Sequence, residues 1–175
     1  LIAEGHLCNL TNKPSSVVYD TSGLHTRMGE FVRREVEDLF GNQQLATAAC
    51  KELIEKSDGR NSVLVFCSGV DHAEIVTEIL GEMTGERVDC VTGETPALLR
   101  EASLSDFSAG RFRFCVSVDV LTTGFDSPRI DCVAIMRATQ SAGLFCQMVG
   151  RGLRTHESKT DALIVDFGGN LKRHG

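Results

Sequence analysis

The chain has 175 residues, of which 42% are hydrophobic and 24% charged, and these values are typical of a globular domain with a buried core. Its formal net charge of −6 argues against a generic basic coat for nucleic acid, but it allows a local groove. No apolar run approaches the roughly 18 residues that span a bilayer, and the first residues lack the basic start of a signal peptide. We therefore expect a cytoplasmic protein without a membrane partner, and we interpret the chain, which opens without Met, as part of a longer one.

Seven cysteines are spread along the chain without any Cys-x-x-Cys pair, so the sequence predicts no zinc knuckle and no metal site. Cys67, Cys115 and Cys132 lie inside apolar runs and are expected to be buried as small hydrophobic side chains. An odd number without a spacing pattern favours a reducing compartment over a disulfide framework.

Short apolar runs alternate with amphipathic segments along the chain. In chain order, they predict a strand at 16–20, helices at 30–40 and 43–56, a strand at 62–67, a helix at 70–83, a strand at 87–91, a helix at 96–109, strands at 112–118 and 131–136, a helix at 142–153 and a strand at 162–167. Thr95 and Pro96 are interpreted as the N-cap and the first residue of their helix. Strands separated by helices predict a mainly parallel sheet with helices on both faces, which is a three-layer α/β sandwich.

Residues 1–41 are expected to form an approach segment and the start of the domain, and residues 42–175 to form the domain itself. In a parallel sheet, ligands bind beyond the carboxyl ends of the strands. Ser68-Gly69 follows one predicted strand and opens a helix, where free N–H groups attract anions, although an ordinary N-cap has the same residues. Thr92-Gly93 follows another strand, and taken alone it would favour a simple loop.

Between two later strands lies the stretch Thr122-Thr123-Gly124-Phe125-Asp126. Hydroxyl groups and backbone N–H groups suit phosphate, a glycine permits close approach of another backbone, and the Asp126 carboxylate suits the hydroxyls of a ribose. Taken alone, this stretch is at least as consistent with a polar turn in which Asp126 caps a local amide.

The most informative segment runs from Gln147 to Arg154 and places Arg151 and Arg154 three residues apart around two glycines. A guanidinium group is permanently charged and matches phosphate geometry, and residues i and i+3 of a helix share a face. Taken alone, the segment would more often be a helix with two solvated arginines. Together with the preceding segments, it indicates a site that binds a phosphoryl group.

The order of these segments resembles the second RecA-like domain of DEAD/DEAH-type superfamily 2 helicases, and it is most similar to the RadD group of DNA-repair ATPases and their phage relatives. The supporting stretches are 63–73, 91–96, 120–128, 147–154 and 159–170. The resemblance implies a RecA-like, P-loop-NTPase-like sandwich. One departure is Val118, which stands where the DEAD-box subgroup has a threonine, and it argues against the RNA-dependent branch.

The resemblance also implies roles for single residues. Arg151 and Arg154 would act as catalytic arginine fingers on ATP held by a partner domain, contributing roughly 10³–10⁵ in rate, with Gln147 beside the same cleft. Gly124 and Asp126 would border the nucleotide. The contacts to the nucleic-acid backbone would come from Ser68, Gly69, Thr92, Gly93, Thr122 and Thr123.

The sequence contains no Gly-x-x-x-x-Gly-Lys-Ser/Thr loop and no Asp-Glu pair. The resemblance therefore assigns the binding of ATP and Mg²⁺ mainly to an N-terminal RecA-like domain of the same protein. We expect this chain alone to be inactive as an ATP hydrolase. The leading hypothesis is the C-terminal motor domain of an ATP-dependent DNA helicase or translocase, with single-stranded or branched DNA as its partner.

Two alternatives stay open. A RecA-like domain could serve only as a non-catalytic module that docks partner proteins, and the paired arginines count against that interpretation because a scaffold has no need of them. A dinucleotide-binding enzyme is the other alternative. Its Gly-x-Gly-x-x-Gly fingerprint is missing from the first strand and turn, Cys67-Ser68-Gly69-Val70.

Overall fold

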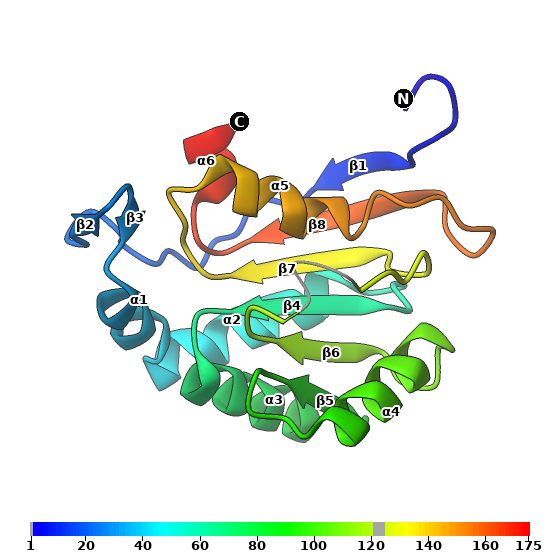
Figure 1. Cartoon of the computed structure of the whole chain (residues 1–175), viewed down its shortest axis with the longest axis horizontal. Helices are drawn as coiled ribbons and strands as arrows, with labels where there is room; N and C mark the ends of the chain where they lie inside the picture. The colour runs from blue at the N-terminus through cyan, green and yellow to red at the C-terminus, as the bar shows by residue number, and fades with distance from the viewer. Residues whose placement is uncertain (1, 121–124) are drawn as a thin grey trace.

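The computed structural model describes residues 2–120 and 125–175, and a six-stranded parallel sheet forms the middle of the molecule (Figure 1). Continuous apolar runs produce its central strands, because those strands are covered on both faces. Val65, for example, lies opposite Val116 on one side and Ala134 on the other. From edge to edge, the strands are β1 (Asn9–Asn12), β8 (Asp161–Asp166), β7 (Cys132–Met136), β4 (Val63–Cys67), β6 (Phe114–Ser117) and β5 (Val88–Val91).

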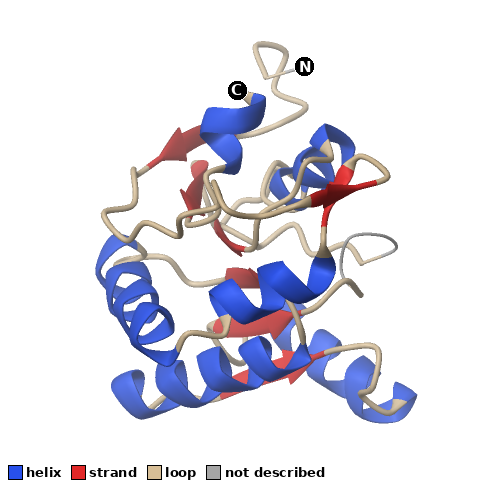
Figure 2. Cartoon of the chain, turned by 90° about the vertical axis from the view of Figure 1, so that its left-hand side faces the viewer, coloured by secondary structure: helices blue, strands red, loops and turns tan. Residues whose placement is uncertain are grey.

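Helices cover both faces of this sheet, as Figure 2 shows from the side. One layer contains α1 (Arg33–Phe40), α2 (Gln43–Lys56) and α3 (Val70–Thr84). The opposite layer contains α4 (Ala97–Ser108), α5 (Ala142–Gly150) and α6 (Asn170–His174). The predicted three-layer α/β sandwich is therefore confirmed. In the described part of the chain, no helix has the length and apolar character that a membrane crossing requires.

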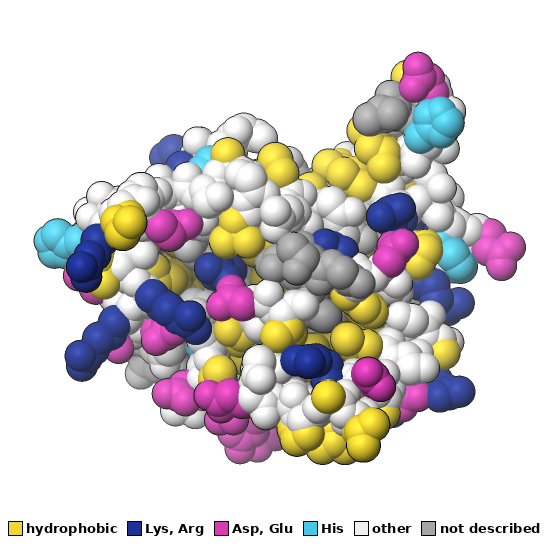
Figure 3. Space-filling model, in the orientation of Figure 1, with side chains coloured by type: hydrophobic (Ala, Val, Ile, Leu, Met, Phe, Trp, Pro, Cys, Tyr) yellow, Lys and Arg dark blue, Asp and Glu magenta, His cyan; other side chains and the backbone are white. Residues whose placement is uncertain are grey.

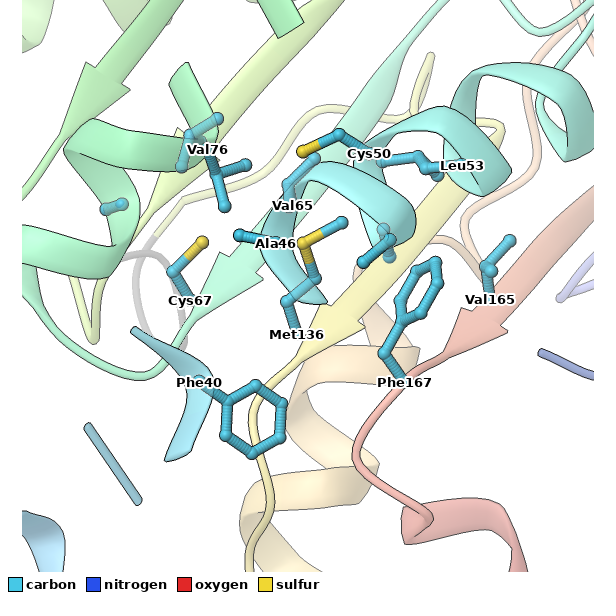
Figure 4. Close-up of a cluster of buried hydrophobic side chains, with 14 of the residues drawn as sticks. Phe40, Ala46, Cys50, Leu53, Val65, Cys67, Val76, Met136, Val165 and Phe167 are labelled. Carbon is cyan, nitrogen blue, oxygen red and sulfur yellow. The ribbon is translucent and has the colours of Figure 1, made fainter. Parts of the chain in front are cut away.

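Two hydrophobic clusters join the three layers. The first packs α1, α2 and α3 against one face of the sheet, and Figure 4 shows Phe40, Leu53 and Val76 around Val65 and Met136. The second packs α4 and α5 against the other face through Phe107, Phe145 and Met148. The three cysteines expected in the core, Cys67, Cys115 and Cys132, are fully buried, which confirms their interpretation as small hydrophobic side chains.

The predicted strand at 16–20 is wrong, because its backbone bonds to a side chain and not to a neighbouring strand. Ser16 and Val17 donate their N–H groups to the Glu52 carboxylate on α2 at 2.7 and 3.1 Å. The predicted helix at 30–40 starts only at Arg33. The residues before it belong to a short hairpin of β2 (Thr26–Arg27) and β3 (Glu30–Phe31), which the apolar pattern did not indicate.

The first residues contribute an edge strand that the sequence did not predict. β1 pairs in parallel with β8, with Leu10 opposite Ala162. Just before it, Leu7 forms an antiparallel bridge with Arg154, and Cys8 donates its N–H to the Leu153 carbonyl at 2.9 Å. This segment therefore lies against the end of the arginine motif. The division of the chain at residue 41 stays a prediction.

The turn after β8 fastens the loop that leads from β7 to α5. Asn170 donates from Nδ2 to the Arg137 carbonyl at 2.7 Å and accepts from the Thr139 N–H at 3.0 Å. Gly168 fits here because a Cβ atom would lie 2.0 Å from the Arg137 carbonyl oxygen. The start of α5 is thereby held at a fixed place on the sheet.

Candidate functional site

One cavity brings together most of the residues that the arginine motif singled out. It has a volume of about 210 Å³ and is lined by Asp126, Gln147, Gly150, Arg151 and Arg154. The loop before β7 supplies the aspartate, and α5 with the residues after it supplies the rest. We call this space the arginine cavity.

The two arginines do not share a helix face, which corrects the prediction of a helix at 142–153. α5 ends at Gly150, Arg151 is its C-cap, and the chain then turns. The turn follows from tertiary contacts. A Cβ atom on Gly152 would lie 3.1 Å from Ala162 Cβ, so the backbone packs directly on β8, and Leu7 draws Arg154 into a bridge. Both guanidinium groups nevertheless line the same cavity.

The arginine cavity is electrostatically positive. Arg154 Nε lies 3.6 Å from Asp126 Oδ1, and both side chains are more than half exposed, at 59% and 54%. Arg151 donates from Nη1 to the Phe125 carbonyl. Burial lowers the pKa of Arg151 and the Arg154 charge lowers it further, while the Asp126 carboxylate raises it; the guanidinium stays charged throughout the physiological range. Among the described residues that line the cavity, two cations therefore accompany one carboxylate.

Two residues outside α5, the nearby Lys159 and the distant Cys8, support the turn at 150–154, and sequence patterns did not indicate them. Lys159 donates from Nζ to the Gly152 carbonyl at 2.8 Å, and Cys8 Sγ contacts the same oxygen at 3.2 Å. A backbone bond from Cys8 to Leu153 completes the support. The only local signal was that Lys159 begins one of the stretches that resemble helicases.

Ser68 and Gly69 lie where β4 passes into α3, as predicted, and Gly69 is the N-cap of α3. The Ser68 side chain is buried, and its Oγ lies 2.9 Å from His72 Nδ1. Next to this turn, Gly69, Arg33 and Glu37 belong to the lining of a cavity of about 530 Å³ between α1 and α3. The hydroxyl of Ser68 is therefore directed inward, and Gly69 lines the open space.

Thr92 and Gly93 form a turn after β5. The Thr92 N–H donates to Thr95 Oγ1 at 3.0 Å, and Thr92 Oγ1 accepts from the Glu94 N–H at 3.1 Å. Thr95 therefore closes this turn and is not the N-cap of the next helix; α4 begins at Ala97 after Pro96, one residue later than predicted. Gly93 is exposed, with open space where a Cβ would be.

The remaining predicted residues, Thr122, Thr123 and Gly124, lie outside the described residues. Asp126 shares the arginine cavity with α5 and is not part of the cavity that Gly69 lines. The described residues therefore form two groups, one around the arginines and one at the carboxyl ends of β4 and β5.

The chemistry of the arginine cavity suits a nucleoside triphosphate. Guanidinium and carboxamide N–H groups donate to phosphate oxygens, and a carboxylate accepts from ribose hydroxyls. Among the residues that the structure describes, no three His, Cys, Asp or Glu side chains are grouped as metal ligands. The arrangement fits binding of phosphate oxygens by side chains of this chain.

A parallel sheet between two helix layers, with paired arginines after the penultimate helix, is the arrangement of a RecA-like domain. The chain belongs to the family of the helicase conserved C-terminal domain, whose family model matches residues 44–156. The predicted superfamily 2 helicase family is therefore confirmed. The finer likeness to the RadD group stays a resemblance of motifs.

Over 120 residues, the chain is 42% identical to a protein of Schizosaccharomyces pombe named as the mitochondrial ATP-dependent helicase irc3, covering 69% of this chain and 20% of the relative. It therefore spans about a fifth of that protein's length. A structure described as an HsdR subunit of a type I restriction enzyme from Vibrio vulnificus matches with a TM-score of 0.78, 23% identity, and coverage of 99% of this chain and 35% of the other.

A second structural match is the Mycobacterium smegmatis helicase Lhr, which was solved with single-stranded DNA and AMP-PNP. Its TM-score is 0.64 at 20% identity, and the match covers 92% of this chain and 20% of Lhr. At these identities, both structural matches demonstrate a shared RecA-like fold.

Proposed function

We propose that this chain is the second motor domain of an ATP-dependent DNA helicase or translocase and that it supplies arginine fingers to ATP bound by the N-terminal RecA-like domain. The observation that supports this most directly is the arginine cavity. Arg151 and Arg154 both line it, and Asp126 is the one carboxylate among the described residues of its lining, so the lining carries net positive charge that suits an anionic ligand. A RecA-like domain that only docks partner proteins would not require a pair of arginines in this cavity.

In this proposal, the two guanidinium groups stabilise negative charge that develops on the transferred γ-phosphoryl group. Mg²⁺, bound by the first domain, would neutralise the β- and γ-phosphate oxygens when present. Arg151 is positioned by the Phe125 carbonyl. The Arg154–Asp126 pair is exposed, and pairs of this kind contribute about 0–1 kcal/mol. Arg154 can therefore exchange the carboxylate for phosphate oxygens, which leaves Asp126 available to ribose hydroxyls.

The carboxyl edge of the sheet would bind the DNA backbone. Gly69, which lines a cavity at the start of α3, and the exposed Gly93 lie at the carboxyl ends of β4 and β5, on the same edge of the sheet with β6 between them. The Ser68 hydroxyl already bonds to His72, so Ser68 would need to exchange that bond for a phosphate. Thr92, Thr122 and Thr123 complete the proposed backbone contacts. The cytoplasm stays our predicted compartment.

The decisive variant is Arg154→Ala in the full-length protein. We expect DNA-stimulated ATP hydrolysis to fall by roughly 10³-fold or more, because a fixed cation no longer faces the developing charge. Arg154 is exposed, so the folded state should persist, as monitored by circular dichroism. Arg151→Ala should give a similar loss of rate.

Arg111→Ala is the matched control. Arg111 is also an exposed arginine paired with one aspartate, Asp106, and it lies outside the lining of the arginine cavity. Its removal should leave the hydrolysis rate near that of the wild-type protein. Hydrolysis that persists in Arg154→Ala would contradict the arginine-finger role and would favour the non-catalytic docking module.

A further inference from the structure

The hairpin of β2 and β3 carries an apolar side chain that the fold does not use. Its two turn residues, Met28 and Gly29, have φ angles of 53° and 81°, so both occupy the left-handed region. The Met28 side chain is 99% exposed. Glycine or asparagine is the usual residue at such a position, because a larger side chain is strained there. Met28 therefore carries backbone strain without gaining any burial.

The hairpin is firmly attached at its base. Glu30 accepts from the Gln140 N–H at 2.6 Å and from Thr139 Oγ1 at 2.5 Å, and both partners lie in the loop between β7 and α5. Phe31 is buried, and the Arg173 guanidinium lies 5.0 Å from its ring centroid. The tip is thus presented on a rigid base, and that base is joined to the loop preceding the helix that carries Gln147.

Basic and acidic side chains are mixed around the hairpin, and the arginines of this region lie on β2 and at the start of α1. Arg27, Arg33 and Arg34 are all exposed, and Figure 3 shows basic side chains gathered at the left, over β2, β3 and α1. Arg33 bonds to Glu37 at 2.7 Å. Among the described residues, Arg27 and Arg34 have no ion-pair partner, so their charge is available to an anionic ligand.

We propose that the β2–β3 hairpin is a DNA contact at the junction between single and double strand, in which Met28 packs against an unstacked base while Arg27 and Arg34 hold phosphates. Apolar side chains such as methionine insert between bases, and arginines neutralise the phosphates of the backbone. The exposed Met28 side chain could therefore contact a base while the neighbouring Arg27 contacts a phosphate. This inference rests on the proposed function and adds a residue-level contact to it.

The link through Glu30 gives the contact a mechanical consequence. The carboxylate bonds to Thr139 and Gln140 immediately before α5, and α5 leads to Arg151. If this domain shifts as a unit when ATP binds at the arginine cavity, the hairpin base would move together with α5. The tip would press on the junction in step with the nucleotide cycle.

The test uses the full-length protein and a forked DNA that carries 2-aminopurine at the junction, a base whose fluorescence rises when it unstacks. We expect the wild-type protein and Met28→Leu to increase the 2-aminopurine fluorescence. Met28→Asn should produce only a small part of that increase. Asparagine tolerates the left-handed turn, so Met28→Asn should melt at or above the wild-type temperature. A lost signal would then report the missing apolar tip and not a damaged fold.

Replacement of Arg27 and Arg34 by alanine supplies a second measurement. Each change should reduce the slope of log affinity against log salt by about 0.7–0.9, because one phosphate contact is lost. An unchanged junction signal in Met28→Asn, or an unchanged salt slope in both arginine variants, would overturn the hairpin contact while wild-type DNA-stimulated ATPase persists. A wild-type protein without DNA-stimulated ATPase would instead refute the proposed motor function, and the hairpin contact with it.

Discussion

At the scale of single residues, His72 is a titratable group enclosed in the core. It is 2% exposed, its ring centroid lies 5.8 Å from that of Phe40, and its Nδ1 accepts from the Ser68 N–H at 3.2 Å. Nε2 has no hydrogen-bond partner among the described residues. Burial lowers the pKa of His72 to about 4, so the ring is neutral at physiological pH.

This predicts a pH-dependent stability. Because the folded pKa lies below the unfolded value of 6.5, the unfolded chain takes up the proton first. The contribution is fully present above about pH 6.5 and decreases as the pH falls towards about 4, by roughly 3 kcal/mol in total. Urea denaturation across that window measures the free energy of unfolding.

His72→Asn is the control for this prediction. Asparagine can still accept from Ser68 but does not titrate, so the variant should be less stable at neutral pH and should show a flatter dependence in the same window. An equally steep decrease in the variant would assign the pH dependence to other groups.

At the scale of elements, the segment at 15–17 has no strand partner among the described residues, and its polar groups donate hydrogen bonds to one carboxylate instead. Glu52 on α2 accepts from Ser15, Ser16 and Val17, and Lys56 Nζ lies 2.7 Å away. Burial by itself would raise the pKa of Glu52, but the hydrogen bonds from Lys56, Ser16, Val17 and Ser15 outweigh it and lower the pKa to about 2. The apolar residues at 17–19 suggested a strand. The segment does not form one because its backbone N–H groups bond to Glu52, which lies on α2.

Glu52→Gln should destabilise the domain by about 2 kcal/mol at neutral pH, because an amide nitrogen would face donors that now bond to oxygen. The variant should also lose less stability than the wild-type protein as the pH falls from about 4.5 towards 2, the range in which Glu52 is protonated on unfolding. Thermal denaturation provides the measurement, and Glu55→Gln on the exposed side of α2 is the matched control. Equal melting temperatures in the two variants would contradict the anchoring role.

At the scale of the whole molecule, the arginine cavity contains the residues that we propose to contact the γ-phosphate, and the sequence of the chain contains no phosphate-binding loop. Arg151, Arg154 and Gln147 line it, but the chain has no Gly-Lys-Ser/Thr loop. The purified chain should therefore show no ATP hydrolysis above buffer in a phosphate-release assay. Addition of the N-terminal RecA-like domain in excess should restore some turnover, and Arg154→Ala should remove it. ATP hydrolysis by the chain alone that is unaffected by Arg154→Ala would contradict the proposal that the N-terminal domain binds ATP and this chain supplies the arginines.

Sequence patterns correctly predicted the helices and strands whose formation depends mainly on neighbouring residues. The helix at 43–56, predicted from its apolar face, has its predicted bounds, and in the structure Asn42 caps it by accepting from the Leu45 N–H at 3.1 Å. The buried strands β4 and β7 were visible as continuous apolar runs. β1 was not, because its four residues are all exposed and it pairs only where β8 offers an open edge.

The sequence by itself determined the fold class and the helicase family, because alternating apolar runs and closely spaced motifs are properties of neighbouring residues. Only the tertiary structure decided how the two arginines are held. Helical periodicity would continue α5 to Leu153, but contacts from Cys8 and Lys159 hold the backbone at Gly152 and the chain turns before Arg154. Tertiary bonds of this kind, above all the one from Cys8, leave no periodic pattern in the sequence, so the shape of the arginine cavity is decided only when the strands are assembled.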